Sequence, residues 1–83
     1  MASTLNTYTK YNGICRNENG LYYDKGRYYP KSLSACQQKC DQTHGCGAFT
    51  WSGNVCYLTS AMVTTTPQNE HDCYSKGQPR IYK

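Results

Sequence analysis

The sequence predicts a small α+β domain whose shape depends on disulfide bonds. Six of its 83 residues are cysteine, whereas Leu, Ile, Val and Phe together number only nine. One segment with helical periodicity lies between segments that have the alternation and turn residues of short strands. Burial of so few aliphatic side chains does not offset an ordering entropy of about 1.5 kcal/mol per residue, so covalent cross-links or a metal must contribute to stability.

The N-terminal third of the chain carries weak strand signals. Residues 1–12 are rich in Thr, Asn and Ser and predict a flexible segment, or an edge strand entered through Tyr8 or Tyr11. Residues 13–83 then form the single domain. Within it, the segments 21–23 and 27–30 are rich in tyrosine and flank Asp24-Lys25-Gly26, which predicts a hairpin.

One helix is predicted over about residues 32–42. Ser32 stands at the N-cap position, and Leu33, Cys36 and Cys40 follow at the spacing of one helical stripe. Gly45 is the expected stop signal after the last turn.

A second hairpin is predicted from residues 46–51 and 55–58, with Ser52-Gly53-Asn54 as its loop. If Trp51 opposes Val55, alternation places one set of side chains on a face of small residues that accepts the helix: Cys46, Ala48, Thr50, Cys56 and Leu58. Phe49, Trp51, Val55 and Tyr57 then share the other face. Residues 62–72 are polar and predict a loop, and closing strands are expected at Cys73-Tyr74 and at Arg80-Ile81-Tyr82.

An even number of cysteines in a short chain predicts a disulfide framework that forms in an oxidising compartment. Cys36 and Cys40 project from one side of the helix with parallel Cβ vectors, so they are poorly placed to bond each other. The turn after the helix and the strand that faces it offer partners, and two cysteines are left to join the ends. The expected pairs are Cys40 with Cys46, Cys36 with Cys56, and Cys15 with Cys73.

Zinc is the alternative reading of the same cysteines. Cys36, Cys40, His44 and Cys46 supply four potential ligands within eleven residues. A single residue between His44 and Cys46 would crowd a tetrahedral site, so the sequence favours disulfides and no metal.

Several function classes are disfavoured. The nine Lys and Arg residues form no run, so nucleic-acid binding is not expected. No stretch approaches the roughly 20 apolar residues of a transmembrane segment. Phosphate-cradling glycine loops and nucleophile elbows are absent from the sequence, and two histidines with five carboxylates offer little for catalysis, so we expect no enzyme activity and no cofactor.

The cysteine content favours a secreted, extracellular protein. Met1-Ala2-Ser3-Thr4 has no apolar core typical of a secretory signal, so we expect a mature segment that restarts with Met. There is no Asn-x-Ser/Thr acceptor, and N-glycosylation is therefore not expected.

Three motifs give the chain a resemblance to a known family. They are Ser-Leu-Ser-Ala-Cys36-x3-Cys40, Cys46-Gly-Ala-Phe-Thr-Trp, and Val-Cys56-Tyr-Leu. This arrangement resembles the PAN/apple domain family over about residues 15–82. The resemblance implies an antiparallel sheet of about five strands that cradles one helix. It also implies nested pairing of the cysteines, first to sixth, second to fifth and third to fourth, which gives the same three pairs.

The PAN/apple resemblance implies a non-catalytic recognition module, because the family binds proteins and carbohydrates in parasite adhesins, clotting proenzymes, leech collagen-binding proteins and oomycete carbohydrate-binding proteins. No ligand-contact motif is transferred from any member. The chemistry of the tyrosine-rich segment and the second hairpin tip predicts the ligand-binding residues, which are Tyr22, Tyr23, Lys25, Arg27, Tyr28, Tyr29 and Trp51.

The leading hypothesis is attachment to a glycan or to an extracellular protein through these side chains. The alternative is a free-standing secreted effector or inhibitor that binds and blocks a target protein. Self-association is a further possibility, in which the domain serves assembly.

Overall fold

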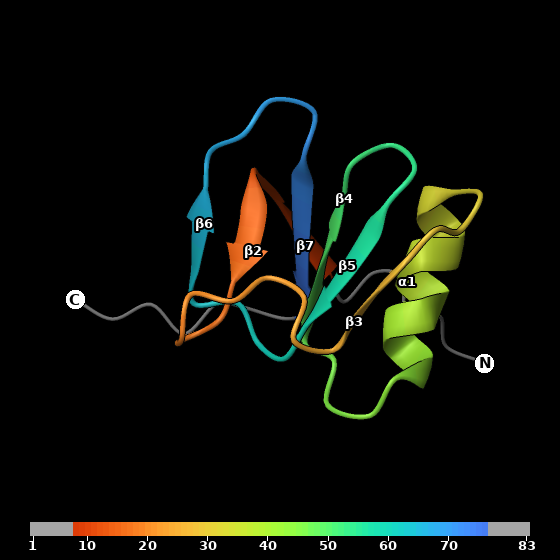
Figure 1. The fold of residues 1–83 in the computed structure, drawn as a ribbon, viewed down its shortest axis with the longest axis horizontal. Coiled ribbons are helices and arrows are strands. Elements are labelled where there is room, and N and C mark those ends of the chain that lie inside the picture. Colours follow the sequence, from red (N-terminus) through yellow and green to blue (C-terminus); the bar gives the residue numbers. More distant parts are fainter. Residues whose placement is uncertain (1–7, 77–83) are drawn as a thin grey trace.

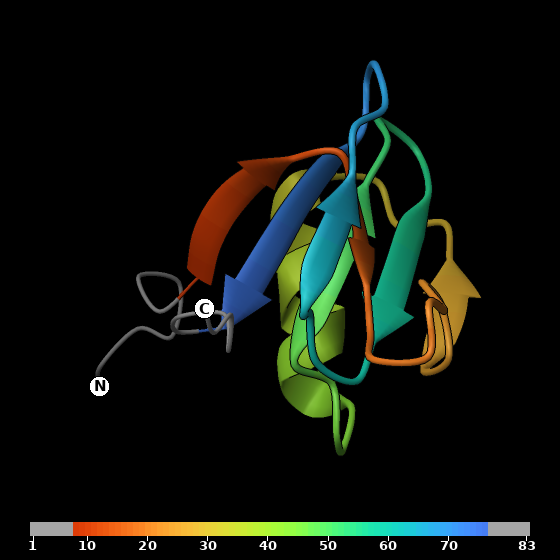
Figure 2. The same ribbon diagram turned by 90° about the vertical axis from the view of Figure 1, so that its left-hand side faces the viewer.

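A five-stranded antiparallel sheet runs through the centre of the structure, a computed structural model that describes residues 8–76. Its strands, in spatial order, are β1 (Tyr8–Asn12), β7 (Asp72–Lys76), β4 (Ala48–Trp51), β5 (Cys56–Thr59) and β3 (Gly26–Tyr28). Helix α1 (Leu33–Gln42) covers one face, and the two-stranded sheet of β2 (Ile14–Arg16) and β6 (Thr64–Thr66) lies on the other (Figures 1 and 2). The described residues therefore form the small α+β fold with one helix that the sequence predicts.

Helix α1 begins where its capping residue predicts. The side chain of Ser32 accepts a hydrogen bond of 3.2 Å from the backbone N–H of Ala35. At the other end, Thr43 donates its hydroxyl to the carbonyl of Lys39 (2.6 Å) and its N–H to the carbonyl of Cys40 (3.1 Å). Thr43 is thus the C-cap, and Gly45, with a φ of +85°, lies in the turn that follows.

The predicted register of the second hairpin is wrong by one residue. Trp51 opposes Cys56, not Val55, because the loop has four residues and the N–H of Ser52 donates to the carbonyl of Val55. Side chains alternate along a strand, so this shift moves Phe49 and Trp51 to the face that packs against the helix. Ala48 and Thr50 lie on the opposite face.

The tyrosine-rich hairpin does not form. Residues 21–23 are a loop, and β3 pairs with β5 instead. Residues 62–72 contain strand β6, which pairs with β2 and which the polar sequence did not indicate. Cys73-Tyr74 lies within β7 as predicted, whereas Arg80-Ile81-Tyr82 lies outside the described residues.

Three disulfides join the layers, and their pairs are those inferred from the sequence. Cys36–Cys56 and Cys40–Cys46 lie on the helix side, and Cys15–Cys73 ties β2 to β7 on the other side. Because Cys36, Cys40 and Cys46 are all bonded to sulfur, the zinc alternative is wrong.

The helix-side core is built around Phe49, which is fully buried. Its ring stacks on Tyr74 at 5.0 Å and meets the edge of Tyr8 at 5.2 Å. Tyr8 also donates its hydroxyl to the carboxylate of Asp41 at 2.7 Å. Burial, this hydrogen bond and the negative charge of Asp41 raise the pKa of Tyr8 well above its usual value. The contact joins edge strand β1 to α1.

Candidate functional site

The loop before β3, residues 17–25, is held in place by the buried polar side chain of Asn17. Asn17 accepts hydrogen bonds from the N–H groups of Asn19 (2.9 Å) and Leu21 (3.0 Å) through its Oδ1. Its Nδ2 donates to the hydroxyl of Ser60 at 3.3 Å. The local hydrogen bonds of Asn17 replace those of a strand, which is the physical reason why residues 21–23 form a loop.

Further hydrogen bonds hold the same loop against β5. Thr59 donates its hydroxyl to the carbonyl of Tyr22 at 2.8 Å, and the carboxylate of Asp24 accepts the N–H of Ser60 at 3.1 Å. The N–H of Lys25 donates to the carbonyl of Leu58 at 2.9 Å. The loop therefore presents its side chains from a fixed backbone.

Three tyrosine rings meet where this loop crosses β5. The ring centroid of Tyr22 lies 4.8 Å from that of Tyr23 and 5.2 Å from that of Tyr57, and Tyr23 lies 6.3 Å from Tyr57. Tyr22 and Tyr57 are partly buried, whereas 46% of Tyr23 is exposed. Two rings thus support a third that is open to solvent.

Two arginines flank these rings. The guanidinium carbon of Arg16 lies 5.2 Å from the centroid of Tyr22, and that of Arg27 lies 5.5 Å from the centroid of Tyr23. Arg16 is also fixed by hydrogen bonds from its Nε to the hydroxyl of Thr66 (2.6 Å) and from its Nη1 to the carbonyl of Gly20 (2.9 Å). We call the group of Arg16, Tyr22, Tyr23, Arg27 and Tyr57 the aromatic-arginine patch.

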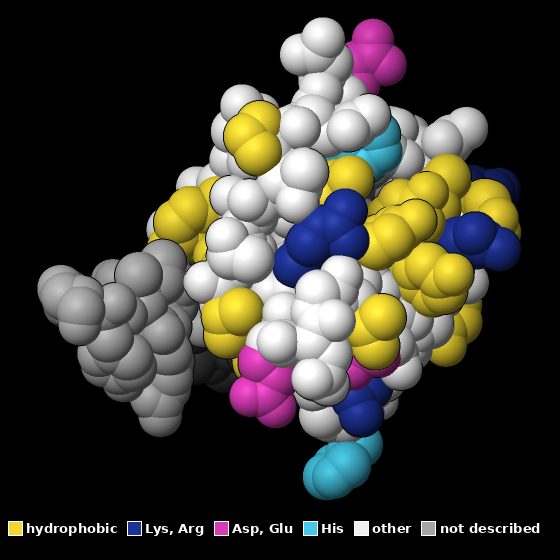
Figure 3. All heavy atoms as spheres, turned by 60° about the vertical axis from the view of Figure 1, so that its left-hand side comes forward, with side chains coloured by type: hydrophobic (Ala, Val, Ile, Leu, Met, Phe, Trp, Pro, Cys, Tyr) yellow, Lys and Arg dark blue, Asp and Glu magenta, His cyan; other side chains and the backbone are white. Residues whose placement is uncertain are grey.

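The patch borders a shallow pocket of about 240 Å³. Its lining consists of Arg16, Gly20, Leu21, Tyr22, Tyr23 and Asp24. Leu21, of which 51% is exposed, adds apolar area to the rim. Figure 3 shows hydrophobic side chains gathered beside basic ones on this side of the molecule. The surface offers aromatic faces, an apolar rim and guanidinium donors, which suit recognition of a ligand.

The structure brings together only some of the predicted ligand-binding residues. Tyr22, Tyr23 and Arg27 meet in the patch. Lys25 extends toward Gly45, where its Nζ lies 3.2 Å from the position that a Cβ on this glycine would take. Tyr29 is 68% exposed but is not among the rings of the patch.

Tyr28 and Trp51 lie on the helix side of the sheet, where both pack against the core. The ammonium of Lys39, on α1, lies 4.4 Å from the ring centroid of Tyr28. Arg16 and Tyr57, in contrast, are patch residues that sequence reasoning did not select. Tyr57 pairs with Arg27 across β5 and β3, and the predicted tyrosine-rich hairpin, which paired residues 21–23 with 27–30, gave no indication of this contact.

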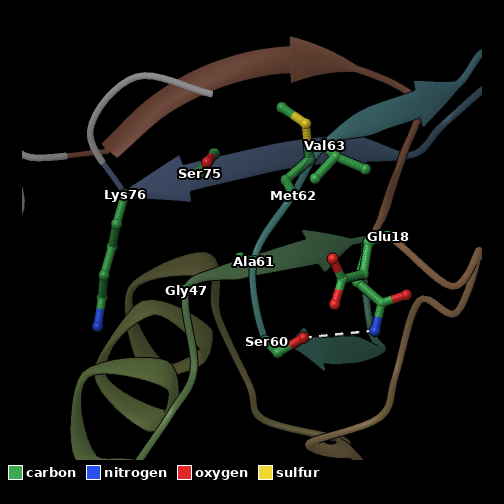
Figure 4. Close-up of a pocket in the computed structure, with 9 residues that line it drawn as sticks. Glu18, Gly47, Ser60, Ala61, Met62, Val63, Ser75 and Lys76 are labelled. Atoms are coloured by element: carbon green, nitrogen blue, oxygen red, sulfur yellow. Dashed lines mark hydrogen bonds between the residues drawn. The ribbon is translucent and has the colours of Figure 1, made fainter. Parts of the chain in front are cut away.

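A larger pocket of about 680 Å³ lies on the same side of the sheet as β2 and β6 (Figure 4). Glu18 and Lys76 stand at opposite ends of it, and Ala61, Met62 and Val63 provide apolar lining. Asn17 and Ser60, which are joined by a hydrogen bond, both line this pocket. Aromatic side chains are absent from its described lining, which distinguishes it from the patch.

Comparisons of the chain with protein-family models, curated proteins and solved structures find no significant match. In the part of the chain that the structure describes, no helix has the length and apolar character needed to cross a bilayer.

Proposed function

We propose that this chain is a secreted, non-catalytic recognition module of the PAN/apple type that binds extracellular carbohydrate through the aromatic-arginine patch. Three disulfides in a small domain support an oxidising, extracellular setting. The disulfides from the Cys-x3-Cys helix to β5 and to the turn before β4 support the proposed PAN/apple type. The three sequence motifs that resemble this family support it as well.

The observation that carries the proposal is the exposed ring of Tyr23 on its support of Tyr22 and Tyr57. A tyrosine side chain offers a flat apolar face and a polar hydroxyl, which suit the apolar faces and hydroxyl groups of a sugar ring. Tyr23 keeps 46% of its area exposed in spite of its contacts with both rings and with Arg27.

The fixed loop backbone strengthens this proposal. Binding costs less conformational entropy when the contacting groups are already ordered in the free protein. The carbonyl of Tyr22 is hydrogen-bonded to Thr59, the last residue of β5, and the carboxylate of Asp24 to Ser60, the residue after it, so the ring of Tyr23 extends from an ordered segment.

A glycan array probed with the oxidised protein tests the proposal. We expect binding that Tyr23→Ala reduces by about tenfold or more, because the variant removes the exposed ring from the centre of the patch. Tyr29→Ala is the matched control, since it removes an exposed tyrosine outside the patch and should leave binding unchanged. Equal binding by both variants, with unchanged melting temperatures, would contradict the proposal.

A protein ligand is the second candidate, and the composition of the patch favours it as well. Tyrosine and arginine are enriched among the residues that dominate protein interfaces. An array without a carbohydrate signal, followed by Tyr23-dependent binding to a purified extracellular-matrix protein, would favour this candidate over the first.

A further inference from the structure

We infer that the carbohydrate ligand is anionic, with a carboxylate or sulfate group bound by Arg27 while the sugar ring packs on Tyr23. This inference rests on the proposed function and specifies the ligand class of the same site. It follows from how the two arginines use their hydrogen-bond donors.

Arg27 has unused donors next to an exposed ring. Its guanidinium carbon lies over the ring of Tyr23, 5.5 Å from the ring centroid. A cation–π contact uses the charge of the guanidinium and engages no carbonyl or carboxylate oxygen, so the five N–H donors of the group can still bind a planar or tetrahedral anion. No hydrogen bond or ion pair within residues 8–76 engages the Arg27 side chain.

Arg16 has a different role because part of its donor set is already engaged. Its Nε and Nη1 bind Thr66 and Gly20, which hold the guanidinium over Tyr22. The positive charge is thereby fixed beside the patch, whereas fewer donors remain for a ligand. We therefore expect Arg27 to contribute more to binding than Arg16 does.

The local charge balance favours an anion. Two guanidinium groups flank the rings, and Asp24 is the one carboxylate that lines the adjoining pocket. The Oδ1 of Asp24 accepts the N–H of Ser60, which offsets part of its charge. Neither arginine forms an ion pair with a carboxylate of the described chain, so their positive potential is directed to solvent.

Calorimetric titration of the oxidised chain with three tetrasaccharides tests the inference. The probes are chondroitin sulfate, desulfated chondroitin, which keeps only the carboxylates, and neutral chitotetraose. We expect at least one of the anionic probes to bind about tenfold or more tightly than chitotetraose, with affinity that falls as NaCl is raised. Binding of both anionic probes would show that the site accepts a carboxylate or a sulfate. Binding of chondroitin sulfate alone would show that the site requires sulfate.

Three variants connect the anion preference to Arg27. Arg27→Gln should weaken binding of the anionic probe by about tenfold or more, because it removes a charge-assisted hydrogen bond. Arg27→Lys should retain part of the affinity, since it keeps the charge but loses the planar donors. Lys10→Gln removes the same charge from β1, at the opposite edge of the sheet, and should change binding less than twofold.

The outcomes separate this inference from the function on which it rests. Tyr23-dependent binding of chitotetraose that equals binding of the anionic probes would overturn the anionic inference and leave the carbohydrate proposal standing. Equal losses for Arg27→Gln and Lys10→Gln would also overturn the inference. Absence of binding to all three probes and to the array would overturn both.

Discussion

On the helix side of the sheet, α1 is joined to the strands by Cys36–Cys56 and, through the following turn, by Cys40–Cys46, with Phe49 and its neighbouring rings beneath. On the other side, β2 is joined to β7 by Cys15–Cys73, and the aromatic-arginine patch is formed by residues of β2, β3, β5 and the loop before β3. Aromatic side chains occur on both sides. They fill a core where the helix covers the sheet, and they remain partly exposed where it does not.

This difference shows that the position of a tyrosine, and not the number of tyrosines, decides its role. Tyr74 and Tyr23 both contact other rings, but Tyr74 stacks on a fully buried phenylalanine, whereas Tyr23 is 46% exposed. Disulfides and a small core stabilise the scaffold, and the patch is left available for a ligand.

The largest expected difference between the two sides concerns their disulfides. Cys15–Cys73 spans 58 residues and Cys40–Cys46 spans 6. On a chain-entropy estimate, removal of the first by paired substitution to alanine costs about 4 kcal/mol, and removal of the second costs about 2 kcal/mol. Thermal unfolding of the two double variants should therefore give the lower melting temperature for Cys15→Ala with Cys73→Ala. The reverse order would contradict the view that loop closure dominates.

A smaller effect is expected where β2 meets β4. Thr50 is fully buried, and its hydroxyl accepts the N–H of Cys15 at 2.9 Å. Thr50→Val should cost about 1–3 kcal/mol, because it leaves this buried N–H without a partner. Thr64→Val makes the same change at an exposed position of β6, and chemical denaturation should find it close to neutral. Equal stability of the two variants would refute the role assigned to Thr50.

On the helix side, the contact between Tyr8 and Asp41 should have a modest effect that depends on pH. Tyr8→Phe removes a hydrogen bond of 2.7 Å and should cost about 1 kcal/mol near neutral pH. Because the pKa of Tyr8 is raised in the folded chain, its contribution is complete below the unfolded value of about 10 and is lost as pH rises through the folded value.

Denaturation curves between pH 7 and pH 11 would measure this contribution. The stability of the wild-type chain should fall toward that of Tyr8→Phe above about pH 10. A difference between the two chains that stays constant over this range would show that Tyr8 does not contribute through its ionisation.

The sequence predicted the features that depend on local chemistry. Ser32 and the stripe of Leu33, Cys36 and Cys40 define the helix, and the direction of the two helical cysteines leads to the disulfide pairs. These inferences need only the geometry of one helix and the short chain segments beside it.

The failures concern strand register and long-range pairing. Loops of three residues (52–54) and of four residues (52–55) use the same turn residues, and the choice between them reverses which side chains of β4 face the helix. Residues 21–23 resemble a strand in composition, but Asn17 and Thr59 bind their backbone. Arg16 reaches Tyr22 only through this loop, so no local pattern indicated it.

Amide chemical shifts followed by NMR during titration with the tetrasaccharide that binds test most directly whether the uncovered side of the sheet is the binding surface. We predict that the largest changes occur at residues 16, 20–24, 27 and 57, and that α1 is unaffected. Changes concentrated along α1, with none at the aromatic-arginine patch, would contradict the account.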